Sequence, residues 1–127
     1  MQNDKIMEFI FANQLASVMN RTKWKELAQE MTYHPEFNPE VRIKYVNDEL
    51  TGYSFYHLDW EWVKSGDVRV IEWMEIDSTR RTYVGRLVDK STVDFSSWVR
   101  QALRKHSIPF DETEGIFRIN GYLKPNS

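Results

Sequence analysis

The sequence has no cysteine among its 127 residues. This absence excludes a disulfide framework, a thiol nucleophile and a thiolate metal site. It also agrees with a reducing compartment, so we expect a cytoplasmic protein. Glycine is scarce as well, because its five residues stand singly along the chain and form no glycine-rich phosphate loop.

Long apolar runs and an excess of positive charge are missing too. No run approaches the roughly 18 apolar residues of a membrane span, and the N-terminus MQNDKIMEF has no apolar block like that of a secretory signal. The formal net charge is −2, whereas nucleic-acid-binding domains are usually basic. The bases near Arg80 and in residues 100–105 lack the glycine–aromatic signature of an RNA-binding strand. We expect neither a membrane nor a nucleic-acid partner.

What is present is typical of one globular domain over residues 1–127. The chain is 41% hydrophobic and 28% charged, and a domain of this length can bury an ordinary core. Aromatic residues are abundant at 14%, with five Trp, six Tyr and seven Phe. Side chains of this kind serve in cores and at protein interfaces alike.

The charge is distributed unevenly along the chain. Residues 36–77 carry ten acids and four bases, whereas residues 78–110 carry two acids and seven bases. One interpretation is a polar molecule with an acidic face. The other is intramolecular, with acidic and basic strands joined by cross-strand ion pairs in one sheet. The sequence leaves both open.

Apolar residues recur with helical spacing in three segments, and we expect helices over residues 4–19, 22–32 and 94–106. The second has the clearest pattern, since its apolar residues fall at i, i+3, i+4 and i+7: Trp24, Leu27, Ala28 and Met31. Asp94 can cap the third helix, and Pro109 lies beyond its end.

Alternating patterns predict strands over residues 41–45, 53–63, 68–77, 81–88 and 115–123, with a turn at 47–52 and a possible bulge at Gly85. The order ααββββαβ is typical of an α+β domain. We expect an antiparallel sheet of four or five strands with helices packed on it. Helices 22–32 and 94–106 should cover its Trp60/Trp62 side, which buries Trp24 and Trp98.

Catalytic patterns are sparse. The histidines at 34, 57 and 106 are too scattered for a local metal motif, and no G-x-S-x-G elbow is present. We therefore expect no enzyme activity, metal or cofactor. One alternative stays open, because His57, Asp59 and Glu61 would share one face of the strand 53–63. They could line the cleft of a small-molecule-binding or enzymatic domain, or simply form a solvated strand face.

Two predicted strands carry apolar residues on both faces. A central strand covered by helices on both sides explains this, and so does a partner-binding surface with apolar anchors inside a charged rim. An acidic rim would also speed association with a basic partner. The candidate partner-binding residues are Phe55, His57, Asp59, Glu61, Ile71, Trp73, Glu75 and Asp77.

Several segments carry a family likeness: LASVMNRTKWKEL at residues 15–27, residues 37–45, IEWMEI at 71–76, GRLV at 85–88, and Pro109 with IFRINGY at 116–122. Through them the chain resembles an uncharacterised bacterial domain family of about 130 residues. The resemblance spans nearly the whole chain. Because it carries no catalytic motif, it implies a fold family and no site residues.

In size, acidity and lack of cysteine, the chain is also similar in type to the immunity proteins of contact-dependent and polymorphic toxin systems. Such a protein blocks one toxin, commonly a basic nuclease, with a shape-matched acidic face. The likeness implies a toxin-neutralising protein that binds a cognate, basic toxin domain and occludes its active or substrate-binding surface. Neither the toxin nor the oligomeric state can be read from the sequence.

Overall fold

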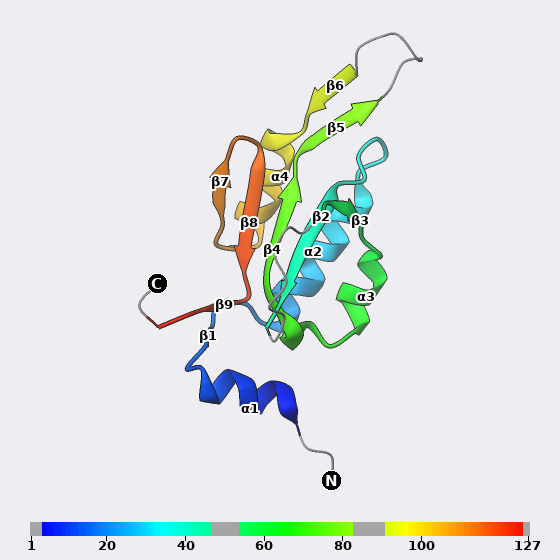
Figure 1. The fold of residues 1–127 in the computed structure, drawn as a ribbon. Coiled ribbons are helices and arrows are strands. Elements are labelled where there is room, and N and C mark those ends of the chain that lie inside the picture. Colours follow the sequence, from blue (N-terminus) through cyan, green and yellow to red (C-terminus); the bar gives the residue numbers. More distant parts are fainter. Residues whose placement is uncertain (1–3, 47–53, 83–90, 126–127) are drawn as a thin grey trace.

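The computed structural model describes residues 4–46, 54–82 and 91–125. A five-stranded antiparallel sheet of order β3-β2-β4-β8-β7 forms its centre, with α2 and α4 against one face (Figure 1). The expected α+β class is confirmed. The elements are α1 Lys5–Ala12, β1 Ala16–Ser17, α2 Arg21–Tyr33, β2 Glu40–Tyr45, β3 Tyr56–His57, α3 Trp60–Ser65, a 3₁₀ helix Val68–Val70, β4 Ile71–Asp77, β5 Thr79–Thr82, β6 Ser91–Asp94, α4 Ser96–Lys105, β7 Asp111–Thr113, β8 Ile116–Asn120 and β9 Tyr122–Leu123.

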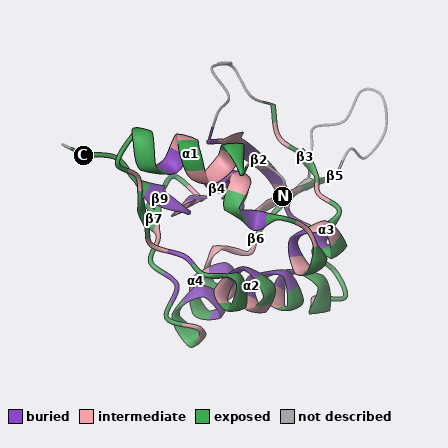
Figure 2. Cartoon of the chain, turned by 90° about the horizontal axis from the view of Figure 1, so that it is seen from below, coloured by how far each residue is buried: buried purple, intermediate pink, exposed green. Residues whose placement is uncertain are grey.

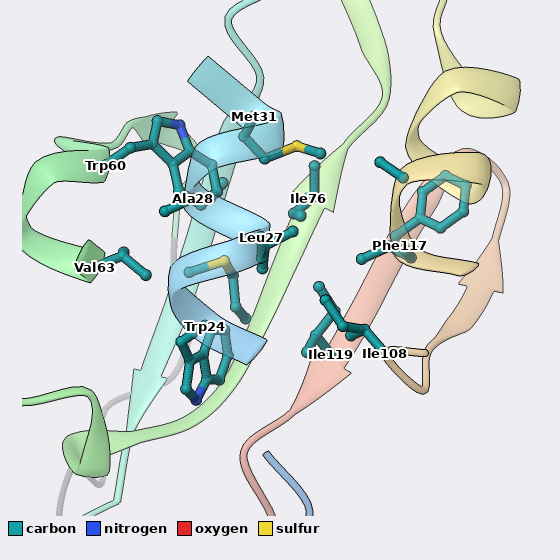
Figure 3. Packing of buried hydrophobic residues seen from close by; sticks show 14 of the residues in the cluster. Trp24, Leu27, Ala28, Met31, Trp60, Val63, Ile76, Ile108, Phe117 and Ile119 are labelled. Atoms are coloured by element: carbon teal, nitrogen blue, oxygen red, sulfur yellow. The ribbon is translucent and has the colours of Figure 1, made fainter. Parts of the chain in front are cut away.

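The core lies between the sheet and the helices. Two cross-strand rows of buried side chains run across β2, β4 and β8, namely Ile43–Met74–Ile119 and Val41–Ile76–Phe117. Figure 3 shows Ile76 beside Leu27 of α2, whereas Phe117 lies against α4 and Ile119 lies beside Ile108. Because a strand alternates its side chains between two faces, the residues between these rows point to the opposite face of the sheet.

The second predicted helix is confirmed as α2. Asn20 begins it, since its side-chain oxygen accepts a hydrogen bond from the Lys23 backbone N–H at 2.8 Å. Trp24 is only 2% exposed, and the other three residues of the apolar stripe are buried beside it. Trp98 of α4 is half-buried and packs against the same core, so both tryptophans are covered as expected. The predicted side was named by Trp60 and Trp62, which lie on α3 and not on the sheet, so that part of the prediction is wrong.

The first helix is shorter than predicted. It ends at Ala12 instead of reaching residue 19, because Asn13 Nδ2 donates to the Phe9 carbonyl and Gln14 takes a left-handed φ of 53°. The chain then reverses into β1, which pairs with β9. Helix α1 packs its buried Ile10 against a small second cluster at the far end of the sheet. In Figure 2 the sheet lies between α1 and the α2–α4 pair.

The predicted strand over residues 53–63 is wrong in its second half. Strand β3 is only two residues long, and the chain enters α3 at Trp60, where Asp59 Oδ1 accepts a hydrogen bond from the Glu61 backbone N–H. Trp60 and Val63 are three residues apart, so both face inward and pack in the main core. His57, Asp59 and Glu61 therefore do not share a strand face, and Trp60 and Trp62 are not sheet residues.

The remaining strands differ from the prediction in their bounds. A 3₁₀ helix precedes β4, which starts at Ile71 instead of residue 68. Of the predicted strand 81–88, residues 81–82 belong to β5 and the rest lies outside the described residues. Strand β5 pairs with β6, which was not predicted. Strand β7 was not predicted either, and the last strand divides into β8 and β9. The predicted turn at 47–52 and Gly85 lie outside the described residues.

The carboxylate of Glu30 joins the C-terminal part of α2 to the end of α4. Glu30 Oε1 accepts a hydrogen bond from Lys105 Nζ at 2.9 Å and lies 2.9 Å from His106 Nε2. These two partners, Lys105 first, hold the pKa of Glu30 below its ordinary value of 4.5. A lowered folded-state pKa means that Glu30 stabilises the fold above the unfolded-state pKa, and that this stability is lost as the pH falls.

We predict that Glu30→Gln flattens the acid side of the stability profile. From about pH 7 to about pH 3.5, the wild-type protein should lose about 0.5–1 kcal/mol more unfolding free energy than the variant, as befits a partly exposed ion pair. Urea unfolding at several pH values measures this difference. Glu8→Gln is the control, since Glu8 is exposed and forms no ion pair with the residues described. Equal profiles for Glu30→Gln and the wild type would contradict the prediction.

Candidate functional site

The face of the sheet opposite α2 and α4 is called here the outer face. It carries the side chains of β2, β4 and β8 that alternate with the two buried rows. Register places Arg42, Glu75 and Arg118 side by side on β2, β4 and β8, with Lys44 and Trp73 in the neighbouring row. Among the described elements, no helix crosses the middle of β4 on this side (Figure 1). Helix α1 reaches only the end near β9.

Five outer-face side chains form one connected chain, which we call the arginine–aromatic chain. Arg42 Nε donates to Glu75 Oε1 at 2.5 Å, and Arg118 Nε donates to Glu75 Oε2 at 3.0 Å. The Arg42 guanidinium lies 4.6 Å from the ring centroid of Phe55, and that of Arg118 lies 4.2 Å from the ring of Trp73. Each arginine is thus fixed by a carboxylate and an aromatic ring together.

Ile71 and Trp73 belong to different environments, although both precede Glu75 on β4. Ile71 is fully buried and packs in the main core. Trp73 is half-buried and belongs to neither apolar cluster. The reason is the irregular register opposite Lys44, where Lys44 pairs with Trp73 and Tyr45 pairs with Ile71. Glu72 is the extra residue of this bulge, and it changes the alternation of β4.

The acidic residues of β4 are paired within the fold. Asp77 Oδ2 accepts from Arg81 Nη1 at 2.5 Å, and Glu72 contacts both Lys44 and Lys124. Glu75 and Asp77 are only 7% and 5% exposed. Intramolecular ion pairing, one of the two interpretations of the charge pattern, therefore accounts for this part of the acidic segment.

The other sequence-predicted residues lie away from the arginine–aromatic chain. Asp59 caps α3, and Glu61 on that helix accepts a hydrogen bond from Lys64 at 3.1 Å. His57 is exposed at the end of β3, where it lines a hollow together with Arg80 and Arg81. The structure thus brings together Phe55, Trp73 and Glu75, and it places Asp59, Glu61 and His57 elsewhere.

A shallow hollow of about 460 Å³ adjoins the arginine–aromatic chain. Its lining includes Asp111 and Glu114, which sequence reasoning missed, together with Arg42, Glu75, Thr113, Ile116 and Arg118. Both carboxylates are exposed, and neither forms an ion pair with the described part of the chain. They reach this face because Gly115, at φ 82°, turns β7 back onto β8. Among the described residues of the outer face, the exposed carboxylates without an ion pair therefore lie in this hollow.

Metal-binding groups and shifted pKa values limit the chemistry that the described residues can support. They contain no group of three or more His, Cys, Asp or Glu side chains that could hold a metal ion. Burial and the neighbouring Tyr45 raise the pKa of Tyr56 to about 12, which keeps its phenol neutral. No described helix is long and apolar enough to cross a membrane.

Comparison with protein families gives one match. The model of a family of unknown function, DUF6678, covers residues 6–126. The chain belongs to DUF6678. This confirms the expected uncharacterised domain of about 130 residues. The DUF6678 match runs from α1 past β9, so it includes every strand that builds the outer face. No curated protein and no solved structure matches the chain.

Proposed function

We propose that this protein neutralises a bacterial toxin by binding it through the outer face and occluding its active or substrate-binding surface. The observation that carries the proposal is the arginine–aromatic chain on the outer face, which no described helix covers. Tryptophan and arginine dominate the energetics of protein interfaces, especially where they lie at the centre of a contact. A half-buried tryptophan outside the core still has apolar surface for a partner to cover.

The arginine–aromatic chain also lowers the conformational-entropy cost of binding. Arg42 and Arg118 are each held at two points, by Glu75 and by an aromatic ring. Side chains already ordered in the free protein lose little rotamer entropy when a partner docks. A surface whose side chains are ordered before binding is what a tight inhibitor needs.

The charge of the face favours a basic partner. Glu75 and Asp77 are paired internally. The negative charge that could attract a partner therefore comes from Asp111 and Glu114, which lie beside the arginine–aromatic chain. Unpaired surface carboxylates attract a basic protein over about a Debye length, roughly 8 Å at physiological ionic strength. The proposal includes a cytoplasmic location, where such a toxin acts, and no turnover by the protein itself.

We predict that the protein co-purifies with the product of the reading frame directly upstream and protects cells that express it. Asp111→Lys should slow association about 3- to 10-fold at low salt, with a smaller effect at high salt, because steering is screened. Stopped-flow or surface-binding kinetics measure both rates.

The matched control for this charge reversal is Glu61→Lys. Glu61 is highly exposed but lies on α3, which packs against α2 on the helix side of the sheet. Its reversal should leave the association rate within about twofold of the wild type. The proposal fails if the upstream product neither binds nor is neutralised, and the outer face is excluded as the docking site if Glu61→Lys slows association as much as Asp111→Lys.

A further inference from the structure

A groove separate from the outer face lies where the segment after α2, the end of β3 and the start of β5 meet, between the labels β3 and β5 in Figure 1. Its larger hollow has a volume of about 790 Å³. Basic side chains surround it, namely Arg80, Arg81, His34 and His57, against one lining carboxylate, Glu36. The hollow therefore favours an anion over a cation.

Arg80 is held in place but not fully satisfied. Its Nη1 donates to the Glu36 carbonyl at 2.8 Å, and its guanidinium lies 5.7 Å from the ring centroid of Phe95. Its Nε is buried and has no hydrogen-bond partner. A buried guanidinium N–H without an acceptor is costly, and such groups in native proteins usually have a partner, which none of the described residues supplies here.

The neighbouring guanidinium adds a second positive group. Arg81 uses its Nη1 for the buried Asp77, while the side chain remains 41% exposed beside the hollow. His57, also exposed, faces the same space. Because the fork of an arginine matches the two oxygens of a carboxylate or phosphate, the hollow suits an oxyanion.

A second hollow of about 320 Å³ continues the groove, since both hollows are lined by His34, Phe37 and Asn38. Its walls include the apolar side chains of Leu58 and Trp60, and the carboxylates of Asp59 and Glu61 also line it, so the negative group of a ligand belongs in the larger hollow.

Trp60 is 4% exposed, and its Nε1 has no hydrogen-bond partner. In Figure 3 the indole nitrogen is directed away from Val63. Each hollow is thus lined by a residue, Arg80 or Trp60, whose buried N–H has no partner among the described residues. Buried donors in native proteins usually have an acceptor, which the chain, water or a ligand supplies.

We propose that this groove binds a small organic oxyanion, a phosphate ester or a carboxylate. Its charged group lies between Arg80, Arg81 and His57, and its apolar part extends along Leu58 toward Trp60. A ligand of this shape supplies an acceptor for Arg80 Nε and covers the apolar wall of the second hollow. The site stands independently of toxin binding, because it shares no residue with the arginine–aromatic chain.

The test titrates the full-length protein with phenyl phosphate and, separately, with benzoate. Two-dimensional NMR follows the Arg80 Nε–H and the backbone amides of His34 and of residues 36–38. At least one probe should bind saturably with a Kd of about 1 mM or below. The tighter of the two identifies the head group, and saturable binding of either at these resonances supports the proposal.

Variants separate the site from general charge attraction. Arg80→Gln should weaken binding at least about tenfold, and Arg80→Lys, which keeps the charge but loses the arginine fork, should weaken it by a similar factor. Arg104→Gln is the matched control, because Arg104 is exposed on α4 and lies outside both hollows. It should change affinity less than about twofold.

Three results would overturn the proposal. One is no saturable shift with either probe up to about 20 mM, far above any specific Kd for this class. Another is an equal loss of affinity in Arg104→Gln and Arg80→Gln, which would indicate general attraction to positive charge. The third is undiminished binding by a natively folded Arg80→Lys, which also decides the matter if Arg80→Gln does not fold.

Discussion

Trp73→Ala should weaken binding of the partner about 30- to 1000-fold while leaving the fold close to its normal stability. The first expectation follows from the 2–4 kcal/mol or so that a central interface tryptophan contributes. The second follows because Trp73 is half-buried and packs in neither apolar cluster, and its contact with the Arg118 guanidinium contributes about 0.5–1 kcal/mol. The affinity loss should appear mainly as faster dissociation.

Trp24→Ala provides the contrast, since Trp24 is buried between α2 and the sheet. Its truncation should cost about 3–5 kcal/mol of unfolding free energy, whereas the folded fraction should bind its partner normally. Thermal unfolding and binding kinetics on both variants separate the two roles. If Trp73→Ala lowers the melting temperature as far as Trp24→Ala and its folded fraction binds with wild-type affinity, Trp73 does not belong to the binding face.

The parts of the fold that could be predicted from the sequence are those fixed by local pattern. The α2 stripe from Trp24 to Met31 spans two full helical turns, so its period is unambiguous. The strand pattern of residues 41–45 is similarly clear, because polar Arg42 and Lys44 alternate with apolar neighbours. From such elements the α+β class follows, since each has one apolar face that must be covered.

Residues 53–63 could not be assigned in this way. Trp60 and Trp62 alternate as in a strand, and a six-residue helix is too short to display a helical period. Two features decide the outcome: Asp59 caps the first turn, and α2 offers the surface on which Trp60 and Val63 pack. The first can be read in the sequence, but the second depends on tertiary contact.

The candidate site shows the same division. Phe55 and Trp73 were identified as possible anchors from apolar residues on both strand faces, but Ile71 was grouped with them because the bulge at Glu72 is invisible in the sequence. The partners of Glu75 come from 33 and 43 residues away, and only strand register brings them together. Charge counting by segment therefore could not reveal that this carboxylate is neutralised.

The close approach of β9 to β4 yields the prediction with the largest effect on stability. A Cβ atom at Gly121 would lie 2.2 Å from the Ile71 carbonyl oxygen, which is backbone and cannot yield as a flexible side chain would. Gly121 also donates its N–H to the Glu72 carbonyl at 2.8 Å, and its carbonyl accepts a hydrogen bond from the Val18 N–H at 3.0 Å. Gly121→Ala must therefore push the chain off β4 and break these bonds.

We expect Gly121→Ala to lower the unfolding free energy by about 3 kcal/mol or more, since overpacking and lost buried hydrogen bonds add. Urea unfolding measures the loss. Relative to the wild type, amide hydrogen exchange should increase most at Val18 and at residue 121. Gly115→Ala is the matched control, because its added Cβ would meet the Ser78 hydroxyl at 3.4 Å and the Thr79 hydroxyl at 3.8 Å, both ordinary van der Waals distances. Its left-handed backbone should cost about 1 kcal/mol. If the two variants prove equally stable, β9 does not depend on this contact, and the joining of α1 and β1 to the sheet rests instead on the cluster around Ile10 and Tyr122.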